Sequence, residues 1–338
     1  MEALKHLCEI KAPSGREIAV RDYIIEKIGD KAEVTVDALG NVIAFVKGEN
    51  RSDKRIMVDA HMDEVGFIVT HIMADGMLKF TTLGGINTAV MLGRRVEFLN
   101  GVKGVISMKP VHMLSSAEKE KMPDEDALYI DIGADSRSEA ETYVSVGDCA
   151  VFGEPYENMG DLILSKAIDD RAGCWAILDI INSKPKYDFY ASFSVNEEVG
   201  AGAKAVAYAI DPDFAIVVES TTAADIAGVN DDKKVCSVGD GAVLSFMDRG
   251  TLYDKSLFEK SLALAKKNGI KAQVKSYVAG GNNAAGIHQS RSGIRTVAVS
   301  VPCRYIHSAS SAASLEDIKS VRDLTKALIE AFASGEMN

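Results

Sequence analysis

Acidic and histidine residues that could bind metal ions occur in five segments spread along the chain. They are His61 and Asp63, Asp169, the adjacent pair Glu197 and Glu198, Glu219, and His307. In four of the five segments these side chains stand at the end of an apolar run with the composition of a β-strand. Because parallel strands present their carboxyl ends at one edge of a sheet, where ligands bind, we expect the side chains to converge. Two imidazoles and several carboxylates at one edge would provide ligands for two divalent metal ions.

Two of these segments have patterns that suggest distinct roles. Glu197 and Glu198 follow the apolar run 189–195, and adjacent carboxylates repel each other unless a metal ion or a proton separates their roles. One can then bind metal while the other acts as a general base toward water. Asp169 precedes a helical pattern and suits a carboxylate that bridges two metals. Each has an ordinary alternative, namely a solvated acidic turn for the pair and a helix N-cap for Asp169 and Asp170.

The other candidates are ambiguous when each is taken alone. Asp63 lies two residues after His61 and could orient an imidazole that binds metal. His61 is otherwise a structural histidine, Glu219 a surface glutamate at a strand end, and His307 a loop histidine. The order and context of all five segments, rather than any one residue, must therefore decide whether these side chains form a metal site.

Length and composition indicate a globular protein with two domains. The 338 residues are too many for one small domain, and 47% hydrophobic with 26% charged residues is an ordinary composition. The net charge of −11 argues against nucleic acid or an anionic membrane as partners, because both attract basic surfaces. We expect neither a secretory signal nor a membrane-spanning segment. The five cysteines lack CxxC spacing and suit reduced thiols, which predicts a cytoplasmic location.

Hydrophobic periodicity predicts an α/β fold with a mostly parallel central sheet flanked by helices. Strand-like runs alternate with helical patterns in residues 1–66 and again in 160–338, which we predict to form one catalytic domain. Residues 67–159 hold short strand-like runs separated by glycine turns, which indicates a small β-rich domain inserted into the catalytic one. The patterns Ser14–Glu17 and Ser314–Asp317 are capping signals that should begin helices.

Five motifs occur in a fixed order along nearly the whole chain. They are Ala60–Gly66 (AHMDEVG), Lys166–Gly173 (KAIDDRAG), Asn196–Gly202 (NEEVGAG), Glu219–Asp225 (ESTTAAD) and Arg304–Ser308 (RYIHS). Together they resemble the M42 family of metallo-aminopeptidases, within the co-catalytic zinc peptidase clan. The resemblance implies the phosphorylase/hydrolase-like α/β fold of zinc aminopeptidases, with a PDZ-like inserted domain used in assembly and substrate access.

The resemblance also implies which side chains bind metal. His61, Asp169 and Glu219 would hold one ion. Asp169, Glu198 and His307 would hold the other. The cofactor would be two divalent metal ions per subunit, with zinc as the first choice and cobalt or manganese as substitutes.

Further roles follow from the same resemblance. Glu197 would be the general base, and Asp63 would orient His61. A cis peptide bond is implied between Asp169 and Asp170. The family resemblance further implies a homo-oligomer of the tetrahedral dodecamer type.

Substrate binding is predicted at Gly281 and Asn283 and at two arginines, Arg249 and Arg304. Many relatives carry aspartate where this chain has Asn283, so that the loss of this carboxylate would alter the substrate side of the site. They also carry aspartate at the position of Glu219, where glutamate supplies the same type of ligand. The arginines could pair with acidic N-terminal residues or form structural salt bridges.

We therefore expect a dinuclear metal-dependent aminopeptidase that removes the N-terminal residue of short peptides, with Glu197 as general base. Three alternatives stay open. A related zinc amidase or deacylase would share the site chemistry and act on N-acyl substrates. An endoglucanase-type hydrolase would use a pair of carboxylates and would not need the histidines. A non-catalytic binding or assembly protein would not need a complete ligand set.

Overall fold

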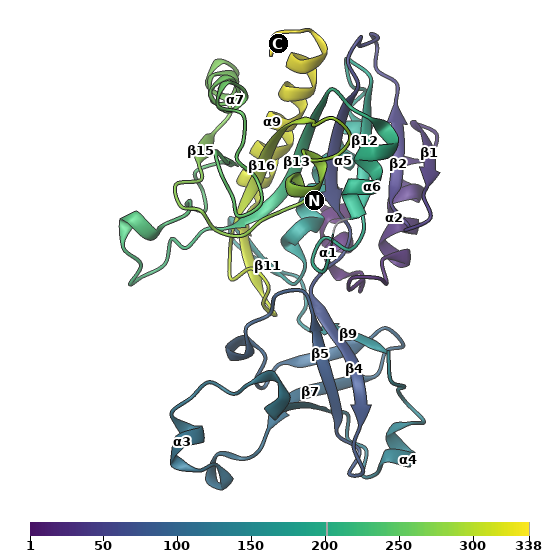
Figure 1. Cartoon of the computed structure of the whole chain (residues 1–338), viewed down its shortest axis with the longest axis vertical. Coiled ribbons are helices and arrows are strands. Elements are labelled where there is room, and N and C mark those ends of the chain that lie inside the picture. The colour runs from purple at the N-terminus through teal and green to yellow at the C-terminus, as the bar shows by residue number, and fades with distance from the viewer. Residues whose placement is uncertain (201, 338) are drawn as a thin grey trace.

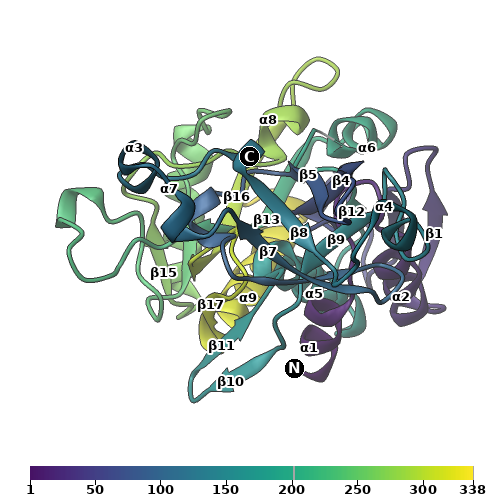
Figure 2. The same cartoon turned by 90° about the horizontal axis from the view of Figure 1, so that it is seen from below.

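The computed structural model describes residues 1–200 and 202–337, so that Ala201 of the Asn196–Gly202 motif and the terminal Asn338 lie outside the described residues. Figure 1 shows a layered α/β domain with a smaller β-domain below it. Seen from below, the smaller domain covers the middle of the larger one (Figure 2).

Eleven of the described strands form the sheet of the larger domain. They are β1 (Ala32–Val36), β2 (Val42–Val46), β3 (Ile56–His61), β10 (Glu157–Met159), β11 (Leu162–Ser165), β12 (Phe189–Ser194), β13 (Phe214–Thr222), β14 (Ala242–Leu244), β15 (Ala272–Val274), β16 (Arg295–Arg304) and β17 (Ser311–Ser314). Their order is β1-β2-β12-β3-β13-β16-β17-β11-β10, with β14 beside β16 and β15 beside β14.

The sheet is mixed, with a parallel centre. Strands β12, β3, β13 and β16 are parallel neighbours, whereas β1, β2, β17, β11 and β10 pair antiparallel. The expectation of a mostly parallel sheet is therefore wrong for the flanks. The reason is local: short turns join β1 to β2 and β10 to β11, and a short turn can only join antiparallel neighbours.

Helices cover both faces of this sheet. They are α1 (Glu2–Glu9), α2 (Ile18–Ile28), α5 (Ile168–Asn182), α6 (Gly202–Ile210), α7 (Lys255–Lys267), α8 (Ala284–Ile287) and α9 (Leu315–Ala333). Alternate residues of β3 enter different cores: Val58 packs in the cluster that includes α5 and α9, and Met57 packs with α6 and α8. All six residues of β3 are buried, as expected for a strand covered on both faces.

The smaller domain is a closed barrel of six strands, with its own apolar core. The strands are β4 (Gly66–Ile72), β5 (Leu78–Leu83), β6 (Arg95–Phe98), β7 (Lys103–Met108), β8 (Leu128–Asp131) and β9 (Cys149–Phe152), with the short helices α3 (Ser116–Lys119) and α4 (Arg137–Ala140) between them. In the core Phe67 makes edge contacts with Phe80 and Phe152. The predicted small β-rich insertion is thus present, and its PDZ-like character stays a prediction.

Two details change the expected boundaries of this insertion. Strand β10 pairs with β11 in the larger sheet, so the chain returns to that sheet before Glu157, earlier than the predicted end at residue 159. Ala309, from the loop between β16 and β17, packs in the core of the barrel. A segment near the end of the chain therefore joins the two parts.

The two predicted capping signals have different outcomes. Ser314 caps α9, since its hydroxyl accepts hydrogen bonds from the backbone N–H groups of Glu316 and Asp317. Ser14 does not cap α2, because its hydroxyl donates to Asp63 Oδ2 at 2.6 Å. Glu17 instead accepts from the backbone N–H groups of Gly15 and Asn196. Each side chain of the predicted capping box therefore binds a distant partner, Asp63 for Ser14 and Asn196 for Glu17, and Glu17 also binds Gly15 within the motif.

A buried group of charges connects the N-terminal segment, the start of the barrel and α5. Glu64 Oε1 accepts hydrogen bonds from Lys166 Nζ at 2.7 Å and from the backbone N–H of Ala12 at 3.0 Å. Arg171, fully buried, lies 3.4 Å from the same oxygen and donates to the carbonyl of Met62 at 2.8 Å. One carboxylate thus balances two buried cations.

None of the described helices is both long and apolar enough to cross a membrane.

Replacing Glu64 with glutamine should lower the free energy of unfolding by about 3–5 kcal/mol, because it leaves two buried cations without a counter-charge. Glu97→Gln is a matched control, since its pair with Lys11 is part-exposed and should contribute about 1 kcal/mol or less. Urea denaturation of both variants measures the difference. Equal losses in the two variants would contradict a stabilising role for the buried group.

Candidate metal centre

The parallel strands bring the predicted ligands to one edge of the sheet. In the pairing of β12 with β3, Ser194 is opposite His61. In the pairing of β13 with β3, Val217 is opposite Asp59, which sets Glu219 level with His61 two residues further on. Glu197 follows the end of β12, and His307 follows the end of β16. The shared strand direction therefore explains why residues far apart in sequence meet.

Three of the predicted ligands surround one point. His61 Nε2 lies 3.3 Å from Asp169 Oδ1 and 3.3 Å from Glu219 Oε1. The ring is almost fully buried. These three side chains form one of the groups in the described residues whose ligand atoms all lie within 4.8 Å of one another.

A second group shares Asp169 with the first. His307 Nε2 lies 3.2 Å from Asp169 Oδ2 and 3.2 Å from Glu198 Oε2. Asp169 thus turns one carboxylate oxygen toward each histidine, as a bridging carboxylate would. Glu197 Oε2 stands 4.0 Å from His61 Nε2, and Glu197 also forms a third group of atoms within 4.8 Å of one another, with His61 and Glu198.

The spacing of these atoms fits metal ligation better than direct hydrogen bonding. Nitrogen and oxygen atoms about 2.0–2.2 Å from a tetrahedral zinc ion are separated by about 3.3–3.5 Å. The separations here are 3.2–3.3 Å, longer than the usual N–H···O distance of about 2.9–3.0 Å. The donor set, imidazole nitrogen with carboxylate oxygen, is also the one that zinc and similar ions prefer.

Buried atoms without partners point to the same conclusion. Among the described residues, Glu198 Oε1 and Glu219 Oε2 are buried and accept no hydrogen bond. Burial raises the pKa of Glu219 well above its usual value and raises the pKa of Glu197 to about 8, and the nearby carboxylates add to both shifts. Cations at this position would replace the protons that such carboxyl groups otherwise hold.

The pKa values of the two histidines are raised as well, but here the cause is the neighbouring negative charge and burial opposes the shift. Burial alone would lower the pKa of His307, but its contacts with Asp169 and Glu198 raise that pKa to about 11. Burial likewise opposes the charge on His61, yet the surrounding carboxylates, Glu219 first, raise its pKa well above the usual value. Both shifts express an excess of negative charge around the two rings.

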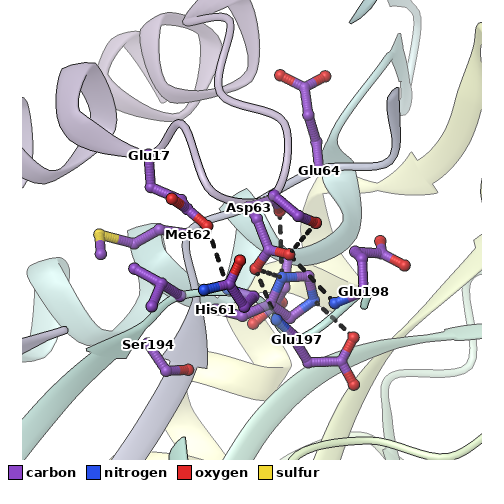
Figure 3. Close-up of polar contacts among 12 residues, drawn as sticks. Glu17, His61, Met62, Asp63, Glu64, Ser194, Glu197 and Glu198 are labelled. Carbon is purple, nitrogen blue, oxygen red and sulfur yellow. Dashed lines mark hydrogen bonds and ion pairs between the residues drawn. The ribbon is translucent and has the colours of Figure 1, made fainter. Parts of the chain in front are cut away.

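Asp63 connects His61 to the Glu197–Glu198 turn, as Figure 3 shows. His61 Nδ1 lies 3.1 Å from the backbone carbonyl oxygen of Asp63 and 3.3 Å from its Oδ1, and Oδ1 also accepts a hydrogen bond from the backbone N–H of Glu197 at 3.0 Å. Its Oδ2 accepts from the backbone N–H of Glu198 at 3.1 Å and from Ser14 Oγ. Asp63 therefore fixes the turn as well as the imidazole.

Sequence reasoning missed two supporting residues on the N-terminal segment. Ser14 holds Asp63, and Glu17 holds the backbone N–H of Asn196, the residue before Glu197. Their pattern in sequence is that of a capping box. The residue types of Ser14 and Glu17 did indicate hydrogen bonding, but the capping-box pattern predicted the wrong partners for them.

The Asp169–Asp170 peptide bond is cis, which confirms the expectation. Asp170 Oδ1 accepts a hydrogen bond from the backbone N–H of Gly173 at 3.0 Å. The ordinary alternative of a helix cap therefore applies to Asp170, and it leaves Asp169 free to face the histidines. A side chain at Gly173 would lie 2.3 Å from Asp170 Oδ2, so this contact requires glycine.

The barrel also reaches the site, which the sequence did not indicate. His307 Nδ1 lies 3.0 Å from the carbonyl oxygen of Gly85, in the loop after β5. A side chain at Gly84, where φ is +86°, would meet Val65 at 2.8 Å and Glu198 at 3.1 Å. The Gly84–Gly85 loop thus packs against one candidate ligand and fixes the ring of another.

The predicted substrate residues are placed differently from one another. Gly281 lines a cavity beside Asp169, Glu197, Glu219 and His307. Asn283 faces away, since its amide donates to Asp59 Oδ2 and to Ser194 Oγ, both at 2.9 Å.

Neither arginine is among the described residues that line this cavity. Arg304 forms two 2.7 Å hydrogen bonds with Asp225. Arg249 is exposed, and its backbone N–H donates to the carbonyl of Gly280 at 2.8 Å. Of the two alternatives left open for the arginines, Arg304 therefore forms a structural salt bridge. The cation that does line the cavity is Lys275, which the sequence analysis did not single out.

Comparison with known proteins defines the class of the chain. Residues 40–324 match the family model described as M42 glutamyl aminopeptidase. A putative aminopeptidase of Acetivibrio thermocellus is 39% identical over 337 residues, which cover 98% of this chain and 97% of that protein. These matches define an aminopeptidase, a hydrolase that cleaves peptide bonds as an exopeptidase. The chain belongs to the M42 family.

Two further relatives have different substrates in their names. The lysyl aminopeptidase of Pyrococcus furiosus is 32% identical over 342 residues, covering 97% of this chain and 96% of that protein. The glutamyl aminopeptidase of Lactococcus lactis is 30% identical over 347 residues, covering 97% and 95%. Membership of the family therefore leaves the preferred N-terminal residue open.

Solved structures give the same fold. An aminopeptidase from Desulfurococcus kamchatkensis has a TM-score of 0.94 at 34% identity, covering 100% of this chain and 96% of its own. The TET1 peptidase of Pyrococcus horikoshii, which assembles into a tetrahedron or a large octahedral shell, has a TM-score of 0.84 at 34% identity, covering 97% and 98%. A Thermotoga maritima protein named an endoglucanase has a TM-score of 0.82 at 34% identity, covering 99% of each chain.

Adding zinc to metal-free protein should release protons, because the pKa values of about 8 for Glu197 and about 11 for His307 mean that these two groups hold protons at neutral pH. Zinc and protons compete, so the affinity should fall as the pH falls below about 8. Calorimetric titration in buffers of different ionisation enthalpy counts the protons.

The Glu197→Gln variant is the matched control and should release about one proton fewer. A zinc affinity that does not change with pH in this range would contradict the charge balance inferred for the site.

Proposed function

We propose that this chain is a dinuclear metal-dependent aminopeptidase that removes the N-terminal residue of short peptides. The observation that carries the proposal is the placement of Asp169, with one carboxylate oxygen toward His61 and the other toward His307. A carboxylate in that position joins two ligand groups into one centre. Membership of a family of aminopeptidases supplies the reaction class.

Each ligand group would hold one divalent ion. His61, Asp169 and Glu219 form the first group, which is the more buried. Asp169, Glu198 and His307 form the second. Zinc is our first choice, with cobalt or manganese as substitutes, because each accepts imidazole and carboxylate ligands.

When bound, the ions would polarise the scissile carbonyl group and lower the pKa of the attacking water. Glu197 supplies the proton transfer. Its side chain lines the cavity without joining either of the two groups that share Asp169. We assign it the role of general base, which takes a proton from water and then gives one to the leaving amine.

Asp63 acts as a positioning residue in this proposal. It holds His61 through Nδ1 and fixes the backbone that carries both Glu197 and Glu198. A carboxylate behind a metal-binding imidazole also fixes which ring nitrogen faces the metal. One side chain therefore orients a ligand from each group together with the base.

We further propose that the chain forms a homo-oligomer of the tetrahedral dodecamer type, with the barrel, whose strands lie between Gly66 and Phe152, serving in assembly and substrate access. The support is the likeness to the TET1 peptidase, which forms such shells. A cytoplasmic location is proposed as well. All five cysteines of the described chain are buried and free, which agrees with a reducing compartment.

Three other functions compete with this proposal. A zinc amidase or deacylase would use the same side chains, so only the substrate separates it from our proposal. An endoglucanase is the name carried by one related structure. Its carboxylate pair would need neither histidine, whereas here both histidines contact the central carboxylate of Asp169. We therefore place the aminopeptidase first, and we place a non-catalytic role last because the ligand groups are complete.

The Glu197→Gln variant should lose about 10²–10⁴-fold in kcat while it keeps its metal, because the base is removed and the ligand groups are not. Hydrolysis of aminoacyl p-nitroanilides and short peptides, before and after chelation and with zinc or cobalt restored, measures activity. Metal content is measured separately. Glu157→Gln, at an exposed glutamate, is the matched control and should retain full activity.

The competing functions give different results in the same assays. Cleavage of N-acylated but not free-amine substrates would establish a deacylase. Cellulose hydrolysis that survives chelation would establish a glycosidase. Metal-loaded protein that cleaves none of these substrates would support a non-catalytic role.

A further inference from the structure

A buried carboxylate two residues before His61 is not explained by metal binding. Asp59 lies within β3 and is fully buried, where a carboxylate is unfavourable unless hydrogen bonds replace the water that it loses. It is a member of none of the possible ligand groups in the described residues. The role of Asp59 must therefore follow from its other contacts.

Three side chains donate hydrogen bonds to Asp59. Ser192 Oγ, which is opposite Asp59 in the pairing of β12 with β3, donates to Oδ1 at 2.5 Å. Ser194 Oγ donates to Oδ2 at 3.2 Å, and Asn283 Nδ2 donates to the same oxygen at 2.9 Å. Asn283 Nδ2 also donates to Ser194 Oγ at 2.9 Å. The two serines belong to the sheet, whereas the asparagine reaches Asp59 from a loop.

This loop borders the cavity of the candidate metal centre. Residues 279–282 line the cavity together with Asp169, Glu197 and Glu219. Asn283 is the next residue along the chain and directly precedes α8. Only 4% of Asn283 is exposed. Its side chain therefore fastens the end of the loop to the interior of the protein.

Other contacts hold the loop to segments outside the parallel centre of the sheet. The carbonyl of Ala279 accepts a hydrogen bond from Lys275 Nζ at 2.6 Å, and the carbonyl of Gly280 accepts from the backbone N–H of Arg249 at 2.8 Å. The hydrogen bond from Asn283 to Asp59, by contrast, joins the loop to β3. Because β3 ends at His61, this bond connects the wall of the cavity to a strand that carries a candidate ligand.

The position of Asp59 within β3 makes the connection a direct one. Side chains two residues apart in a strand point to the same face of the sheet, so Asp59 lies on the same face as His61. Ser192 and Ser194 are opposite them on β12, and Glu197 follows the end of that strand. A loop fixed to Asp59 is thus held close to the strand ends that carry His61 and Glu197.

We infer that Asp59 and Asn283 are positioning residues, which together hold the loop 279–282 in place relative to the candidate metal ligands and so shape the space that receives the substrate. This inference rests on the proposed aminopeptidase function. Neither side chain contacts the reacting atoms. Asn283 acts on the substrate through the loop, and Asp59 acts through Asn283.

The two residue types are complementary. The amide nitrogen of Asn283 donates to the carboxylate of Asp59, whereas a carboxylate at residue 283 would place a second negative charge at hydrogen-bond distance and be repelled. Exchanging the two residues would again pair one amide with one carboxylate. The hydroxyl of Ser194 can accept from the one and donate to the other, so that the same contacts can form in reverse.

The test measures KM and kcat of metal-loaded variants with a panel of aminoacyl p-nitroanilides. Asn283→Asp should raise KM about 10-fold or more, because a displaced loop no longer fits the substrate. It should change kcat by less than about 3-fold and leave the bound metal unchanged, because the loop contributes binding rather than proton transfer. Asn230→Asp, which adds the same charge at an exposed asparagine, is the matched control and should change neither constant.

The exchange variant, Asp59→Asn together with Asn283→Asp, should return KM to within about 3-fold of the wild-type value. A role in folding stability alone would not predict this rescue. Asn283→Ala removes the donor without adding a charge, which protects the test against misfolding of Asn283→Asp, and it should also raise KM. Hydrogen–deuterium exchange of residues 279–287 should be faster in both single variants and should slow again in the exchange variant.

The outcomes separate this inference from the function on which it rests. Unchanged KM and unchanged hydrogen exchange in Asn283→Asp would overturn the positioning role. Loss of metal with a fall in kcat would overturn it as well, because Asp59 and Asn283 would then support the ligands rather than the loop. A folded exchange variant without rescue would also contradict it. If the metal-loaded wild-type protein cleaves no free-amine substrate, the aminopeptidase proposal fails, while hydrogen exchange still tests the attachment of the loop.

Discussion

The structure depends on a concentration of buried negative charge. Asp63, Asp169, Glu197, Glu198 and Glu219 lie around two imidazole rings, and carboxylates this close raise the free energy of the fold unless protons, backbone N–H groups or cations balance them. The parallel strands fix the distances, the cavity admits the substrate, and divalent ions supply the balancing charge under the proposed function. The same repulsion that opposes folding of the metal-free chain makes the position attractive to cations.

Two further groups of contacts keep this arrangement rigid. Asp63 joins His61 to the Glu197–Glu198 turn, and Ser14 holds Asp63 in turn. Behind it, the buried charges around Glu64 link the N-terminal segment to the helix that begins beside Asp169. Short segments from distant parts of the sequence are thereby fixed relative to one another. Such precision is needed when an ion must contact several ligands at once.

The convergence of the candidate ligands could be predicted from the sequence because most of them follow buried strands, and the strand direction then dictates where they meet. The sequence did not reveal with which residues the individual side chains form hydrogen bonds. Ser14 and Glu17 have the local pattern of a capping box but bind Asp63 and Asn196 instead. Lys275 was missed because a single lysine after a three-residue strand has no pattern that separates it from a surface lysine. The antiparallel hairpin of β1 and β2 could be predicted from its turn, whereas the antiparallel pairing of β10, β11 and β17 was missed because strands of three or four residues are too short to show a clear alternation.

The contact between His307 and the carbonyl of Gly85 ties the barrel to the candidate metal centre. Ala309, two residues after His307, is buried in the barrel core. One candidate ligand is therefore held by two separately packed units. An ordered second ligand group then requires both units to be folded, so that unfolding of the barrel would release His307 even though every candidate ligand lies outside the barrel strands.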